Sequence, residues 1–138
     1  MWPFAKPKPT PPGVIIRNVL GEEIDRVEGV WRLTSADLRG RNWPHADLRG
    51  HSFYSADLEG VVLLGADLRG CSFTYCNLKN ATLAYALIDG ADFRKTDLDG
   101  ADLLYTNVTS AQLYGAIITA SSTIPGIKVV YTKRPEVA

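Results

Sequence analysis

Apolar residues recur at every fifth position between residues 31 and 120. Counted from Trp31, this stretch divides into eighteen consecutive groups of five residues without a gap. In most groups the first residue is small and the second is Asp, Asn, Ser or Thr. A spacing of five moves an apolar residue off any single face of an α-helix, so the pattern argues against helices. The third residue of every group is apolar: Leu33, Leu38, Trp43, Leu48, Phe53, Leu58, Leu63, Leu68, Phe73, Leu78, Leu83, Ile88, Phe93, Leu98, Leu103, Val108, Leu113 and Ile118.

Each group of five predicts a short strand followed by a corner. Its first three residues alternate inward, outward and inward, which is the period of a β-strand. Phe53, Phe73 and Phe93 recur after twenty residues, so four groups are expected to complete one coil with four sides. The corners fall at the fifth positions, where relaxed backbone angles are needed. Many groups end there in glycine, among them Gly40, Gly50, Gly60, Gly70, Gly90 and Gly100.

We therefore predict an all-β fold, a quadrilateral β-helix of about 4.5 coils over residues 31–120. With neighbouring strands about 4.8 Å apart, the stack is expected to be about 22 Å tall. The repeated A-(D/N)-L-x-x groups resemble those of the pentapeptide-repeat family. That resemblance implies a right-handed β-helix with the third-position side chain and the small first-position side chain both inside. It implies no single activity, because one fold hosts many functions.

The start of the chain predicts an extended arm. Residues 1–13 are rich in proline and have no hydrophobic pattern, which is typical of a polyproline-like segment. On this arm Trp2 and Phe4 are expected to be anchors that dock into another subunit. The alternative interpretation, that the arm has no role, stays open.

Caps are expected at both ends of the β-helix, because an end coil exposes unpaired strand edges. Residues 14–30 predict a β-hairpin cap with a turn at Gly21. Residues 121–138 predict a C-terminal cap and tail, with a strand at Ile127–Thr132.

The sequence predicts no catalytic, cofactor or metal site, and therefore no enzyme. His45 and His51 lie six residues apart without Cys or carboxylate partners at ligand spacing. Cys71 and Cys76 are expected to be thiols of the core, since adjacent sides point them apart for a disulfide. The first residues contain no apolar run long enough for a signal peptide or a membrane span. A cytoplasmic location, or a place in a virion or other large assembly, is therefore expected.

Charged residues follow the repeat as well. The 15 basic and 15 acidic residues sum to a net charge of zero, which gives no reason to expect direct binding to nucleic acid. A column of alternating charge is expected to pair across coils. Arg41 occupies a slot that should be small and inward, so it is expected to turn outward or to meet the hairpin. The column consists of Arg39, Glu59, Lys79 and Asp99.

One predicted side differs from the other three because apolar residues replace its outward polar ones. A contiguous apolar strip rimmed by charge is typical of a protein-contact surface. Two plainer interpretations are possible. These residues are ordinary hydrophobic residues scattered on the surface, or a terminal segment of the chain folds across the strip. The strip consists of Val62, Leu64, Ala84, Tyr85, Leu87, Leu104 and Tyr105.

We interpret the chain as a non-enzymatic structural or protein-interaction module. It would self-associate as a homo-oligomer or dock into a larger assembly such as a phage particle, with no direct nucleic-acid or membrane partner. The alternative comes from the family resemblance, since some pentapeptide-repeat proteins imitate duplex DNA and bind DNA gyrase, which they protect from quinolones or inhibit. Such mimicry needs a continuous acidic surface, whereas Arg39, Arg49, Arg69 and Lys79 interrupt the acidic columns. An enzyme with an unrecognised site is the least favoured interpretation.

Overall fold

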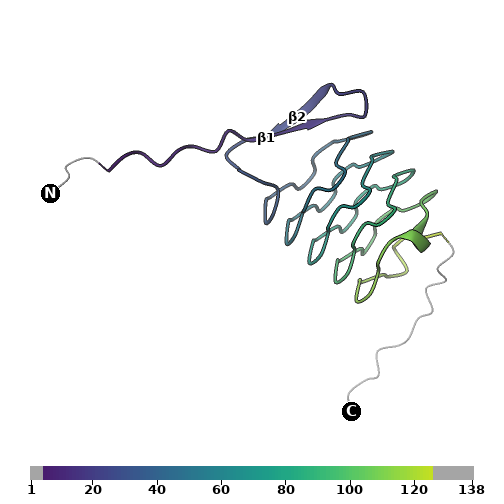
Figure 1. Ribbon diagram of the computed structural model, residues 1–138. Helices are drawn as coiled ribbons and strands as arrows, with labels where there is room; N and C mark the ends of the chain where they lie inside the picture. Colours follow the sequence, from purple (N-terminus) through teal and green to yellow (C-terminus); the bar gives the residue numbers. More distant parts are fainter. Residues whose placement is uncertain (1–4, 126–138) are drawn as a thin grey trace, which may run out of the picture.

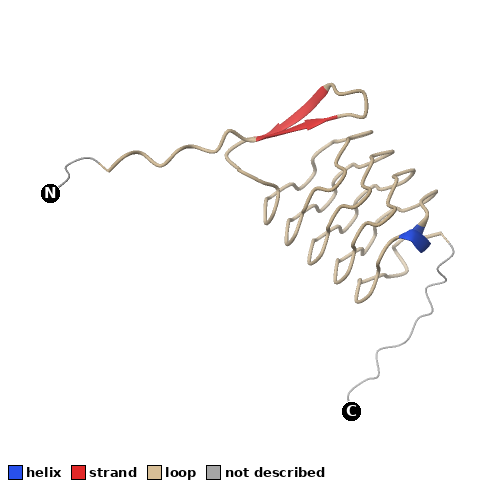
Figure 2. Ribbon diagram, in the orientation of Figure 1, coloured by secondary structure: helices blue, strands red, loops and turns tan. Residues whose placement is uncertain are grey.

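The computed structural model describes residues 5–125 (Figure 1). Residues 5–13 run away from the body of the protein without regular structure. Two strands, β1 (Val14–Arg17) and β2 (Glu23–Val27), form an antiparallel hairpin, and η1 (Val108–Ser110) is a short 3-10 helix. The rest of the chain winds as turns in stacked coils, because each side of a coil is too short for an extended strand (Figure 2).

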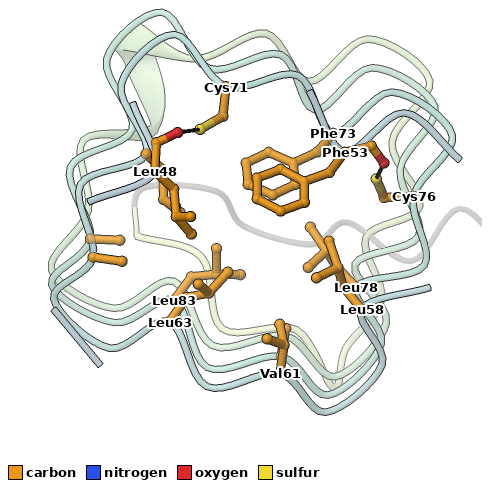
Figure 3. Close-up of a cluster of buried hydrophobic side chains, with 14 of the residues drawn as sticks. Leu48, Phe53, Leu58, Val61, Leu63, Cys71, Phe73, Cys76, Leu78 and Leu83 are labelled. Carbon is orange, nitrogen blue, oxygen red and sulfur yellow. Dashed lines mark hydrogen bonds between the residues drawn. The ribbon is translucent and has the colours of Figure 1, made fainter. Parts of the chain in front are cut away.

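The coils stack in a register of twenty residues. Nearly every isolated parallel bridge joins the second residue of one group to the second residue of the group twenty positions later, as between Asp37 and Asp57. The chain therefore returns to the same side after four groups, and Figure 3 shows the four-sided outline. The predicted β-helix is confirmed. We number its sides by the groups of the first coil: side 1 is residues 36–40, side 2 is 41–45, side 3 is 46–50 and side 4 is 51–55.

The third-position side chains fill the interior (Figure 3). Phe53, Phe73 and Phe93 stack with successive ring-centroid separations of 5.1 and 4.9 Å. Cys71 and Cys76 are free and buried, which confirms the prediction of core thiols. Each thiol donates to a main-chain carbonyl of the preceding coil, at 2.9 and 2.6 Å respectively. These hydrogen bonds allow polar first-position side chains to stay inside the β-helix.

The hairpin packs against the first coil. Ile16 of β1 and Val27 of β2 are buried in the same apolar cluster as the coils. Just after β1, the N–H of Val19 donates to the carbonyl of His45 at 2.8 Å, and the N–H of Asp47 donates to the carbonyl of Arg17 at 2.8 Å. The hairpin thus gives sides 2 and 3 of the first coil the backbone partners that an open strand edge would lack.

Asp25 of β2 ties the hairpin to side 2. Its carboxylate accepts a hydrogen bond from Nε1 of Trp43 at 2.6 Å and lies 3.1 Å from Nη1 of Arg41. Arg41 therefore meets the hairpin, which is one of the two placements that the sequence left open. Burial raises the pKa of Asp25, but the hydrogen bonds from Trp43, the Arg26 backbone and Arg41 outweigh burial, so the pKa is lowered overall.

The C-terminal end of the described chain departs from the register. η1 replaces an ordinary corner of side 3. The last bridge of side 2 then joins Asp102 to Thr123, a step of 21 residues rather than twenty. Ile124 is buried against the core, so the described chain ends on side 2, one coil beyond Leu104.

Several predictions concern residues outside the described range. The anchors Trp2 and Phe4 and the strand at Ile127–Thr132 lie there. The segment boundaries also stay predictions: residues 1–13, 14–30, 31–120 and 121–138.

Replacing Asp25 by alanine is expected to lower the free energy of unfolding by about 1–3 kcal/mol, because Trp43 and Arg41 lose their shared acceptor. Urea unfolding followed by tryptophan fluorescence measures the change. Asp89→Ala is the control, since Asp89 is exposed, and its effect is expected to stay below about 0.5 kcal/mol. Equal losses in the two variants would contradict the role assigned to Asp25.

Candidate interaction surface

Side 2 brings the fourth-position residues Leu64, Ala84 and Leu104 into register. The N–H groups of the residues that follow Leu64 and Ala84 donate to the carbonyls of Ala84 and Leu104, both at 2.9 Å. At the next corner the rings of Tyr85 and Tyr105 stack with their centroids 4.6 Å apart. Consecutive coils therefore place the members of the predicted strip side by side.

The exposed part of this strip is smaller than the sequence predicts. Ala84 is only 6% exposed, so it supports the surface from below. Val62 and Leu64 are half-buried and form its edge. We name the four exposed members the Tyr–Leu patch: Tyr85 (59% exposed), Leu87 (48%), Leu104 (40%) and Tyr105 (69%).

His45 bounds the patch towards the first coil. A Cβ atom at Gly65 would lie only 2.6 Å from Nδ1 of His45. The imidazole therefore occupies the space beside Gly65, in the same corner column as Tyr85. This contact gives His45 a packing role that the sequence did not predict.

Bidentate ion pairs lie on the outer surface of sides 1 and 3. Arg39, Arg49 and Arg69 each direct Nε and Nη2 at the two carboxylate oxygens of the aspartate two residues earlier, at 2.6–2.9 Å. The hydrogen bond from Arg39 lowers the pKa of Asp37 to about 2. Arg49 also lies 3.7 Å from Asp67 in the next coil. The aspartates therefore carry little unpaired negative charge on these sides.

The structure corrects the predicted column of alternating charge. Among the described residues, Arg39 pairs with Asp37 and Asp57, and Lys79 pairs with Asp97, so neither pairs with Glu59 or Asp99. The second and fourth positions of a group both point outward on the same strand. Arg39 consequently reaches the aspartate of its own group, whereas Lys79, whose group has Asn77 at the second position, reaches Asp97 in the next coil.

Two shallow hollows lie away from the patch. One of about 460 Å³ is lined partly by Trp31 and His51, and Nδ1 of His51 lies 3.0 Å from the carbonyl of Leu48. The other, of about 320 Å³ on side 4, is lined partly by Tyr75 and Lys95, whose Nζ lies 5.5 Å from the tyrosine ring centroid. Within residues 5–125 no three His, Cys, Asp or Glu side chains could hold a metal ion. In the same range, no helix has the length and apolar character to cross a membrane.

A stack of four-sided coils, each in contact only with its neighbours, defines a solenoid repeat protein of the β-helix class. The model of the family described as "Pentapeptide repeats" matches residues 32–63, 52–84 and 83–119, with 8 copies. These matches cover most of the chain, which therefore belongs to the pentapeptide-repeat family. Among curated protein sequences, none matches this chain.

Solved structures of other pentapeptide-repeat proteins are similar. A protein of the Arabidopsis thaliana thylakoid lumen is 26% identical over 72% of each chain, with a TM-score of 0.45. Rfr23 from the cyanobacterium Cyanothece 51142 is 24% identical over 59% of this chain and 63% of its own, with a TM-score of 0.36. QnrB1, a plasmid-mediated fluoroquinolone resistance protein, is 18% identical over 75% of this chain and 64% of its own, with a TM-score of 0.47. The chain thus spans less than two thirds of Rfr23 and of QnrB1.

Because Asp67 and Arg69 form an ion pair, we expect the folded protein to lose stability in acid. The hydrogen bond from Arg69 lowers the pKa of Asp67, whose carboxylate is nearly buried. The contribution of this ion pair to the free energy of unfolding is therefore complete above the unfolded-state pKa of about 3.9. It is lost as the pH falls through the lower pKa that Asp67 has in the folded protein.

Asp67→Asn is accordingly expected to destabilise the protein at pH 6 and to have a smaller effect at pH 2, as measured by urea unfolding. Arg69→Gln should show the same dependence, because it removes the other partner of the pair. A penalty that is equal at both pH values would contradict this assignment.

Proposed function

We propose that this protein is a non-enzymatic protein-interaction module that self-associates through the Tyr–Leu patch. The observation that carries the proposal is the contiguity of four exposed apolar side chains on consecutive coils, with two stacked tyrosine rings among them. An apolar surface of this kind, bordered by charge, is typical of protein contacts, and tyrosine is enriched at their energetic centres. The same surface would serve docking into a larger assembly.

Electrostatics favour the patch over the arginine-paired first coils of sides 1 and 3. Leu87 stands at the second position of its group, one coil beyond Asp67 in the same column. With leucine in place of aspartate, this coil has no arginine–aspartate ion pair on side 3. A partner on sides 1 or 3 of the first coils would have to desolvate bidentate ion pairs, which is costly. A partner on the patch instead buries apolar area, at a gain of about 25 cal/mol per Å².

The second interpretation is that the protein imitates duplex DNA, and it comes only from the family resemblance. Duplex DNA presents one negative charge per about 1.7 Å of axis. Here Asp37, Asp47 and Asp67 are each held by an arginine of the same group. The arginines divide the acidic columns into neutral pairs, and these pairs favour the protein-contact interpretation.

The variant Leu64→Arg/Leu104→Arg tests the proposal. Wild-type protein is expected to form dimers or larger species that become more abundant with concentration, whereas this variant is expected to stay monomeric because it places two charges in the contact. Light scattering measures the solution mass. Thr34→Arg/Thr74→Arg is the matched control, with the same added charge at fourth positions of side 4, and should associate as the wild type does. Association that survives in the side 2 variant would contradict the proposal.

A supercoiling assay separates the two interpretations. Micromolar protein is expected to leave the supercoiling activity of DNA gyrase unchanged, with or without a quinolone, because the surface lacks a continuous acidic column. Inhibition or quinolone protection that is abolished by Asp37→Lys/Asp67→Lys would establish the DNA-mimic interpretation instead.

A further inference from the structure

The described chain ends beside the Tyr–Leu patch. Residues 121–125 lie on side 2, where the N–H of Leu103 donates to the carbonyl of Thr123 at 2.7 Å. The N–H of Thr123 in turn donates to the carbonyl of Ala101 at 2.8 Å, and Ile124 is buried. These contacts hold the chain in place one coil beyond Leu104. Whatever follows residue 125 in the sequence therefore starts next to the patch.

Two carboxylates frame the patch. Asp89 is exposed and lies two residues after Leu87, and Asp102 is half-buried and lies two residues before Leu104. Among residues 5–125, neither forms an ion pair, unlike the paired aspartates of the first coils. The surface thus combines exposed apolar side chains with two carboxylates that form no ion pair within this range. Its complement is an apolar segment that carries cations on both flanks.

The sequence after residue 125 has this composition. Residues 127–134 read IKVVYTKR. Its apolar members are Ile127, Val129, Val130 and Tyr131, and its cations are Lys128, Lys133 and Arg134. The cations stand before and after the central apolar residues, as the carboxylates stand on either side of the patch.

The segment is long enough to reach. Leu104 lies one coil below the end of the described chain and Leu87 two coils below it, so the patch extends over about 10 Å at a coil spacing of about 4.8 Å. Eight extended residues span about 26 Å. A tether this short gives an effective concentration of the order of millimolar. Even a weak contact within one chain would then compete with a partner at micromolar concentration.

We propose that residues 127–134 dock on the Tyr–Leu patch of their own chain and compete there with the protein partner. This inference rests on the proposed function, because it assigns a regulator to the same surface. The patch is occupied in the isolated protein and is released when a partner displaces the segment. Self-association is accordingly weaker in the full chain than the exposed apolar area alone would produce.

Disulfide trapping in the full-length chain tests the contact. Leu104→Cys is combined in separate variants with Val129→Cys and with Val130→Cys, and the proteins are exposed to oxidised glutathione. Cys71 and Cys76 do not interfere, because burial raises the pKa of each to about 12 and keeps them as thiols. Thr74→Cys, at the same position of a group on the opposite side 4, replaces Leu104→Cys in the control.

A disulfide within one chain is expected with Leu104→Cys, at a yield at least fivefold above the Thr74→Cys control. One of the two valine positions should react far better than the other, since successive side chains of an extended segment face opposite ways. Adding Lys128→Glu/Lys133→Glu/Arg134→Glu should lower this yield at least threefold at low salt. Yields equal to the control, or disulfides that mainly join two chains, would overturn the proposal.

The association assay distinguishes failure of this inference from failure of the proposed function. The charge-reversed segment, without added cysteines, is expected to strengthen self-association at least fivefold, and Leu104→Arg should remove that gain. Association through the patch without any disulfide within one chain would overturn the inference and leave the proposed function intact. A disulfide within one chain of a protein that never associates would support the inference and overturn self-association.

Discussion

The requirement that each coil contain twenty residues underlies every other feature of this protein. When the count holds, each position lies over the same position of the next coil, and one backbone bridge per side joins them. Stacked phenylalanine rings in the core and stacked Tyr85 and Tyr105 rings on the surface are two results of one register. The register also has a conformational cost. Tyr85 and Tyr105 occupy corners with positive φ of 61° and 59°, a region that disfavours non-glycine residues by about 1–2 kcal/mol. The ladder of backbone hydrogen bonds must offset this strain at each such corner.

The same register explains why polar residues inside this protein indicate structure rather than chemistry. The first position of a group is narrow, and its side chain lies near a carbonyl of the coil before. Cys71 and Cys76 donate to such carbonyls, and Thr96 donates to the carbonyl of Phe73 at 2.6 Å. A thiol held in this way loses its reactivity, because burial raises its pKa to about 12. The thiols of Cys71 and Cys76 and the hydroxyl of Thr96 therefore cap main-chain carbonyls.

The sequence was sufficient for the β-helix because its signal is periodic and local. An apolar third residue and a corner at each fifth residue predict the coil without reference to any distant contact. The sequence could not identify Asp25 as the partner of Arg41. The two residues are 16 positions apart, and the docking of the hairpin brings them together. The arginine–aspartate pairs within groups were readable in principle from strand alternation, since second and fourth residues share a face. The exposed area of the patch was not readable, because it depends on how closely neighbouring side chains pack, as the burial of Ala84 shows.

The Tyr–Leu patch can serve as a contact surface because it lies where the repeat abandons its own charge pattern, at Leu104 of side 2 and at Leu87 of side 3. Where an arginine stands at the fourth position of sides 1 and 3, the aspartate at the second position of the same group holds it. At Leu87 the aspartate is absent, so the following Asp89 has no arginine of its own group, and the rings of Tyr85 and Tyr105 stack at the adjoining corner. Tyr75 on side 4 differs, because Lys95 lies over its ring and donates to its hydroxyl at 3.3 Å. The absence of an arginine–aspartate pair in this group therefore leaves both an exposed apolar area and a carboxylate that forms no ion pair among the described residues. A surface with both properties selects for partners that bring apolar side chains and positive charge together.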